Sequence, residues 1–173
     1  MKLRHLIVPL VLALPIPTAA ALAGNGDERS AAAEAASATA VFHDVERAKN
    51  AGYAELRDAA GIACISQPGV GTMGIHYVNG GLLDGTIDAK APEALVYEPE
   101  ENGSLKLSAL EYIVFQDVWD ATHTGPPELF GKQFNFTPSP NRFGIPAFYS
   151  LHAWIWKPNT AGLLQPFNPN AHC

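Results

Sequence analysis

The chain has 173 residues, of which 11 are Lys or Arg and 17 are Asp or Glu, and its formal charge at pH 7 is −6. This length suits one domain with a hydrophobic core of its own. The sequence has no cluster of basic residues, which argues against a partner bound through a phosphate backbone, so we expect no nucleic-acid partner.

Residues 1–23 have the layout of a secretory signal peptide. Lys2 and Arg4 give a basic start, residues 6–14 form a short apolar run, and residues 19–23 supply small side chains for cleavage. The apolar run is too short to span a bilayer. Removal of this segment would leave 150 residues with a formal charge of −8. We therefore expect a secreted or periplasmic protein without a membrane anchor after cleavage.

The predicted mature chain contains two cysteines, Cys64 and Cys173. An even number of cysteines in an exported protein favours a disulfide bond. Two free thiols are the alternative. A metal site built from these two cysteines alone would lack the paired spacing that is usual in such sites.

Residues 24–40 are rich in alanine and polar side chains and have no stable apolar face. This composition favours a flexible linker or a frayed helix between the cleavage site and the domain. A single globular domain is then expected over residues 41–173.

Residues 41–60 carry apolar side chains at spacings near three, four and seven, which predicts an amphipathic helix. Ser37 or Thr39 could cap its start, and Gly61 is placed to end it. The apolar stripe consists of Phe42, Val45, Tyr53, Leu56 and Ala60.

Strand patterns dominate the rest of the chain. Short strands are predicted over residues 73–78 and 149–156. Residues 94–98 and 105–115 are expected to form a hairpin, because the Asn102-Gly103 dipeptide between them favours a tight turn. The expected fold class is α+β, with the N-terminal helix packed on a curved, mostly antiparallel β-sheet that is barrel- or roll-like.

Residues 120–146 contain five prolines and few periodic signals. Such a long irregular segment is typical of a lid or a rim. Its aromatic residues could cover a hydrophobic pocket, although aromatic side chains in such a loop also serve to pin it to the domain. These residues, in and just after the segment, are Phe130, Phe134, Phe136, Phe143 and Phe148.

Residues 69–74 match the G-x-G-x-x-G fingerprint of dinucleotide-binding proteins. That fingerprint functions only where it opens a helix whose N-terminus meets the pyrophosphate. Here it continues into Ile75-His76-Tyr77-Val78, which has a strand pattern. We therefore interpret these glycines as residues of a tight turn before a strand.

Glu111 lies in the middle of an apolar row of the predicted strand 105–115. Alternation places it on one face with Leu107, Ala109 and Ile113. An unpaired buried carboxylate is costly, so Glu111 must be paired, protonated or bound to a metal. His76 and His152 raise the same question, because each interrupts an apolar stretch of a different predicted strand.

Two histidines and one carboxylate on separate strands can form a facial site for a divalent transition metal such as iron, manganese or zinc. The alternatives are a buried hydrogen-bond network that stabilises the sheet and an acid–base site without metal. No H-x-H or H-E-x-x-H spacing is present. We expect His76, Glu111 and His152 to converge within one layer of side chains.

A second group of candidates consists of Glu98, Tyr77, Tyr112 and Trp154. Glu98 ranks lower because a two-residue turn at Asn102-Gly103 would place it opposite Leu107, about 13 Å from Glu111 along the sheet. The neighbouring acidic residues, Glu100 and Glu101, suggest that Glu98 is solvated.

Three sequence strings resemble a family of exported bacterial proteins without an established activity. They are His76-Tyr77-Val78-Asn79, Leu110-Glu111-Tyr112 and Leu151-His152-Ala153-Trp154-Ile155-Trp156-Lys157, followed by Asn168-Pro169 before Cys173. The resemblance implies an exported single domain in which the two cysteines form a pair. It implies no reaction.

The function that these observations favour is the binding of a small apolar ligand or a metal ion at a His/Glu cluster in an aromatic pocket. A metal-dependent or acid–base enzyme that uses the same cluster is one alternative. A structural or interaction module without catalytic activity is the other.

Overall fold

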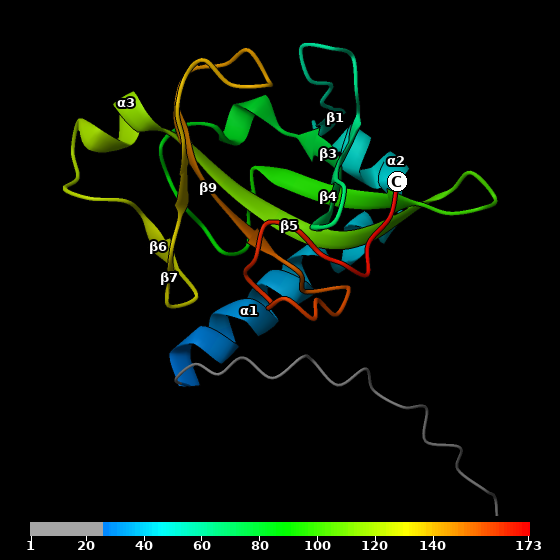
Figure 1. The fold of residues 1–173 in the computed structure, drawn as a ribbon. Coiled ribbons are helices and arrows are strands. Elements are labelled where there is room, and N and C mark those ends of the chain that lie inside the picture. Colours follow the sequence, from blue (N-terminus) through cyan, green and yellow to red (C-terminus); the bar gives the residue numbers. More distant parts are fainter. Residues whose placement is uncertain (1–25) are drawn as a thin grey trace, which may run out of the picture.

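The computed structural model describes residues 26–173, so the signal peptide expected over residues 1–23 lies outside the described part. The fold is α+β, as predicted, with a seven-stranded antiparallel sheet in the order β1-β3-β4-β5-β9-β8 and β2 on the outer side of β3 (Figure 1). Across the described residues the sheet is curved and roll-like and does not close into a barrel. None of the helices in residues 26–173 combines the length and apolarity needed to cross a membrane.

The helical elements are α1 (Gly26–Thr39), η1 (Ala40–His43), α2 (Val45–Asn50), η2 (Gly80–Leu82) and α3 (Gln116–Asp120). The strands of the main sheet are β1 (Ala54–Glu55), β2 (Cys64–Gln67), β3 (Gly71–Val78), β4 (Ala94–Pro99), β5 (Leu105–Phe115), β8 (Asn135–Thr137) and β9 (Phe148–Ala153). A separate two-stranded sheet consists of β6 (Glu128–Leu129) and β7 (Lys132–Gln133).

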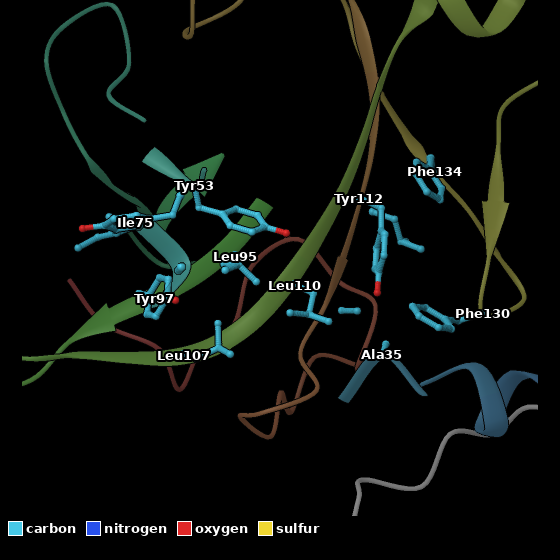
Figure 2. Packing of buried hydrophobic residues seen from close by; sticks show 14 of the residues in the cluster. Ala35, Tyr53, Ile75, Leu95, Tyr97, Leu107, Leu110, Tyr112, Phe130 and Phe134 are labelled. Atoms are coloured by element: carbon cyan, nitrogen blue, oxygen red, sulfur yellow. The ribbon is translucent and has the colours of Figure 1, made fainter. Parts of the chain in front are cut away.

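Most of the segment expected to be a flexible linker or frayed helix forms the regular helix α1. Ala35 and Thr39 of this helix are fully buried, and Ala35 faces Tyr112 and Phe130 of the core (Figure 2). Alanine has the highest helix propensity, and its small side chain lets the helix approach the core closely. The ordered domain therefore includes residues before position 41.

The helix expected over residues 41–60 is much shorter than predicted. Asp44 caps α2 by accepting a hydrogen bond from the backbone N–H of Glu46 at 3.0 Å. Helix α2 ends at Asn50, and Gly52 follows with φ of +97°, a conformation that glycine adopts without strain. The chain then enters β1, which pairs with β3.

The hairpin expected around Asn102-Gly103 is confirmed as β4 and β5, but its register contains a β-bulge. Ala94 lies opposite Glu111, as predicted, whereas the bulge after Val96 places Glu98 opposite Lys106 instead of Leu107. The extra residue on β5 reverses the alternation of faces near the turn. Leu107 consequently packs in the main core and not on the face of Glu111.

The main core lies between one face of the sheet and the helical elements that cover it. Figure 2 shows Tyr97, Leu107, Leu110 and Tyr112 on this side of β4 and β5. The opposite face is covered at one end by residues 154–173, called the C-terminal segment below. Val96, Ala109, Trp154 and Ala171 form a second buried cluster there.

The C-terminal segment is fixed to the sheet at two places. Cys64 of β2 and Cys173 form the predicted disulfide bond. Thr72 and Asn168 exchange two backbone hydrogen bonds, each of 3.0 Å. The strand expected over residues 149–156 ends at Ala153, because the N–H of Trp154 donates to the carbonyl of Leu163 in this segment instead of to β5.

The proline-rich segment 120–146 contains the short strands β6, β7 and β8 between irregular stretches. Phe130 and Phe134 are buried in the main core, so they pin this segment to the domain. Strand β8 adds to the edge of the sheet beside β9. The remaining part, residues 138–147, leads from β8 into β9 and is called the 138–147 loop below.

Candidate metal centre

The three leading candidates lie on three strands and share the sheet face opposite the main core. His76 is in β3, Glu111 in β5 and His152 in β9. Glu111 is paired with His152 on one side and with Ala94 on the other. Ala94 carries only a methyl group, so the surface of β4 beside Glu111 leaves room for the imidazole of His76.

The structure brings these side chains into contact, as the sequence predicts. The Nε2 atom of His76 lies 3.2 Å from Oε2 of Glu111, and Nδ1 of His152 lies 3.2 Å from Oε1 of Glu111. The two Nε2 atoms are 3.2 Å apart. All three side chains are buried, with exposed fractions of 3% for His76, 5% for Glu111 and 1% for His152.

Glu111 is an anion in this setting. Burial raises the pKa of its carboxyl group, because a charge is poorly solvated in the protein interior. The positive charge that His152 and His76 carry when protonated, and their hydrogen bonds to the carboxylate, act in the opposite direction and outweigh burial. The pKa of Glu111 is therefore held well below its usual range.

One ring nitrogen of the cluster, Nδ1 of His76, takes no part in its hydrogen bonds. Both carboxylate oxygens accept when His152 donates from Nδ1 and His76 donates from Nε2. The Nδ1 atom of His76 is buried and has no hydrogen-bond partner among the described residues. His76 therefore retains one unused position for a hydrogen bond.

A cavity of about 70 Å³ adjoins the cluster. His76 and Glu111 line it together with the hydroxyl-bearing residues Thr137 and Ser150. The rest of its wall is apolar and consists of Leu56, Met73, Val78, Ile113, Phe143, Ile145 and Phe148. The polar cluster thus forms one side of a small, mostly hydrophobic chamber.

The second-tier residues do not join the cluster. Tyr77 and Tyr112 point to the main core on the other face of the sheet, where Tyr112 donates a hydrogen bond of 2.8 Å to the carbonyl of Ala89. Trp154 stacks near His152 with 6.2 Å between ring centroids, and its indole N–H donates to the carbonyl of Gln165 at 2.7 Å. Trp154 therefore packs the C-terminal segment against the sheet.

Glu98 is not solvated, contrary to the expectation from its acidic neighbours. It is 2% exposed and accepts hydrogen bonds from the Ser108 hydroxyl at 2.6 Å and from the backbone N–H of His172 at 3.0 Å. The ammonium group of Lys157 lies 3.0 Å from its Oε2. The C-terminal segment covers Glu98 and supplies two of these three partners, which the local sequence could not reveal.

The sequence predicts the polar side of the chamber but not all of its apolar wall. Leu56 falls in the predicted helix 41–60 and Met73 begins the predicted strand 73–78, and neither is predicted to line a cavity, yet both do. Their contribution depends on where β1 and the 138–147 loop lie in space. Ser150 also lines the cavity, and the available signal in the sequence is its position two residues before His152, on the same face of the strand.

Comparison with protein-family models, with curated proteins and with solved structures finds no match for this chain.

Proposed function

We propose that this protein is an exported metal-binding domain that holds a divalent transition metal ion through His76, Glu111 and His152. The observation that carries the proposal is the convergence of the three side chains: one ligand atom from each lies within 4.8 Å of the others. The three residues come from strands far apart in the sequence, and all three are buried.

The chemistry of the donor set supports a transition metal. Two imidazole nitrogens and one carboxylate oxygen are ligands that zinc and non-haem iron accept, and both metals keep further coordination positions open in such sites. The Nε2 atom of His76 lies 3.2 Å from Oε2 of Glu111 and 3.2 Å from Nε2 of His152. Two donor atoms at that separation, each about 2.1 Å from a common ion, subtend about 100° at that ion. This angle suits a facial arrangement of three ligands.

The surroundings of the ligands also fit this use. When the Nε2 atoms of both histidines and Oε2 of Glu111 are directed at the ion, the Nδ1–H of each histidine points away from the ion and can donate a second hydrogen bond, which orients a metal-bound histidine. His76 would then carry its proton on Nδ1, and we expect a water molecule to accept it, since His76 lines a cavity large enough for water.

A structural network is the competing explanation, because the same three side chains satisfy most of their hydrogen bonds without an ion. An acid–base site in which the histidines exchange a proton with a ligand in the cavity is the other alternative. Both alternatives differ from the proposal in requiring no metal.

Metal analysis of the protein purified without chelator tests the proposal. We expect about one equivalent of a transition metal per chain, or uptake of one equivalent of added Zn²⁺, Mn²⁺ or Fe²⁺ by the metal-free protein. Glu111→Gln should weaken this uptake at least tenfold, which is the scale of loss when one metal-site interaction is removed. Glu98→Gln is the matched control, because it makes the same change at a carboxylate that is equally buried.

Metal uptake that is unchanged in Glu111→Gln, or absent from the wild type, would contradict the proposal. Equal losses in Glu111→Gln and Glu98→Gln would show that the effect follows from general destabilisation. Loss of stability in Glu111→Gln without any metal in the wild type would favour the structural network.

Export to an oxidising compartment belongs to the same proposal. The Cys64–Cys173 disulfide bond supports it, because such bonds persist in secreted and periplasmic proteins and are rare in the cytosol. The predicted signal peptide agrees with this location. N-terminal sequencing of the mature protein after expression with its own leader would test it, with cleavage expected after Ala23.

A further inference from the structure

The chamber beside the cluster is small. A cavity of about 150 Å³ takes a molecule of benzene's size. The volume here, about 70 Å³, corresponds to roughly two or three non-hydrogen atoms on that scale. The chamber is therefore suited to a diatomic or triatomic molecule.

The wall of the chamber also restricts the charge of such a molecule. Among the described residues that line it, none is a lysine or arginine, and Glu111 supplies a carboxyl group. Most of the remaining wall is hydrocarbon, so a charged molecule would lose its hydration there. A bound metal ion would attract an anion, but the Glu111 carboxylate offsets part of the charge of the ion. A neutral, weakly polar molecule carries no such penalty.

We infer that the chamber binds a neutral molecule of two or three non-hydrogen atoms, of the dioxygen class, at the open coordination positions of the metal ion. This inference rests on the proposed metal site. His76 and Glu111 line the chamber and belong to the metal-ligand set, so a molecule in the chamber lies next to the ion. Ser150 and Thr137, which both carry hydroxyl groups, line the same chamber.

Ile145 marks the route by which such a molecule reaches the chamber. This residue of the 138–147 loop lines both the chamber and a hollow on the outer surface, formed with Gln116, Asp117 and Gly144. The loop is held in place by the Asn141 side chain, which donates to the carbonyl of Ile145 at 2.9 Å. We expect a molecule of two or three atoms to enter here when the Ile145 side chain moves aside.

Nitric oxide and xenon are the probes for this inference. Nitric oxide is a neutral diatomic molecule that adds to an open position of Fe²⁺ and gives a characteristic electron paramagnetic resonance signal. Protein that is loaded with Fe²⁺ in the absence of air and then exposed to nitric oxide should show this signal. Xenon is apolar and binds no metal, so crystals of the metal-free protein under xenon pressure report on the chamber alone.

Ile113→Phe tests whether the chamber is the site, because Ile113 lines it. This variant should keep its iron and lose at least about tenfold in nitric oxide affinity, which is the scale for a steric clash of one or two methylene groups. Ile62→Phe is the matched control, since Ile62 is 47% exposed and lies outside the chamber. Ile145→Phe provides a second blocking variant on a different element, and circular dichroism checks that each variant is folded.

Equal nitric oxide affinity in the wild type and in both folded blocking variants would overturn the inference. Absence of xenon from the wild-type chamber would also overturn it. If the wild type takes up zinc or manganese but no iron, the metal proposal stands and the inference fails. If it takes up no divalent transition metal, both fail, even where xenon occupies the chamber. If iron binds but nitric oxide does not, the metal proposal stands and the inference alone fails.

Discussion

Glu111 and His152 face each other directly across the β5–β9 ladder, with 3.2 Å between Oε1 of the carboxylate and Nδ1 of the imidazole. Backbone pairing of two central strands sets this distance, so the pair exists whether or not an ion is bound. A ladder that positions two ligands in advance reduces the conformational entropy lost on metal binding.

The same pair contributes to the stability of the metal-free protein. Glu111→Gln replaces an anion by a neutral amide between two imidazoles, which weakens two hydrogen bonds to a charged group. We expect the free energy of unfolding to fall by about 2–4 kcal/mol in the presence of chelator. Denaturant titration measures it, and Glu101→Gln at an exposed position is the control. An unchanged midpoint would show that the carboxylate has no stabilising partners.

The cluster could be predicted from the sequence because period-two alternation is a local property. Each of His76, Glu111 and His152 interrupts an apolar strand, and antiparallel pairing then brings residues of one face together. The strands themselves were recognised by their β-branched and aromatic residues and by the Asn102-Gly103 turn. These signals depend on near neighbours in the chain.

The features that sequence reasoning missed depend on distant contacts. Helix α1 has no large apolar side chain, and its burial through Ala35 becomes apparent only when the core that it contacts is known. The bulge after Val96 changed the register of Glu98 by one residue. The partner at position 172 lies 74 residues from Glu98 in sequence, so no local pattern could indicate that this carboxylate is buried.

Glu98 should hold the C-terminal segment on the sheet. Glu98→Ala removes the acceptor of Ser108 and of the His172 N–H and leaves the ammonium group of Lys157 without its partner. We expect a loss of about 2–4 kcal/mol in the free energy of unfolding. Hydrogen exchange of residues 168–173 should also become faster. Glu101→Ala, at an exposed site, should change neither quantity.

The raised pKa of Glu93 predicts that the stability of the protein depends on pH. Its side chain is 1% exposed and accepts from the backbone N–H of Ile113 at 2.8 Å, and burial raises its pKa to about 8 from an ordinary value of 4.5. Between these two values the folded protein binds a proton that the unfolded chain has released. The contribution of Glu93 to stability therefore falls as the pH rises through this window, by roughly 1.4 kcal/mol per unit at most.

Glu93→Gln should remove this dependence, because an amide does not titrate and its oxygen can still accept from Ile113. Thermal unfolding at pH 5, 6.5 and 8 measures the effect. We expect the melting temperature of the wild type to fall more steeply across this range than that of the variant. Parallel curves for the two proteins would mean that Glu93 ionises normally in the folded state.

Replacing different glycines of residues 69–74 should lower the free energy of unfolding by different amounts, although they belong to one motif. A Cβ at Gly74 would lie 2.7 Å from Cγ1 of Val96 and 2.9 Å from the carbonyl oxygen of Tyr97, and φ there is +112°. A Cβ at Gly69, where φ is +77°, meets no atom within 4 Å. Gly69→Ala should thus cost about 1 kcal/mol for the positive φ alone. Gly74→Ala should cost roughly 3 kcal/mol, because the steric clash with β4 is added to that strain. Denaturant titration of both variants gives the comparison, and equal losses would show that β4 moves aside freely at Gly74.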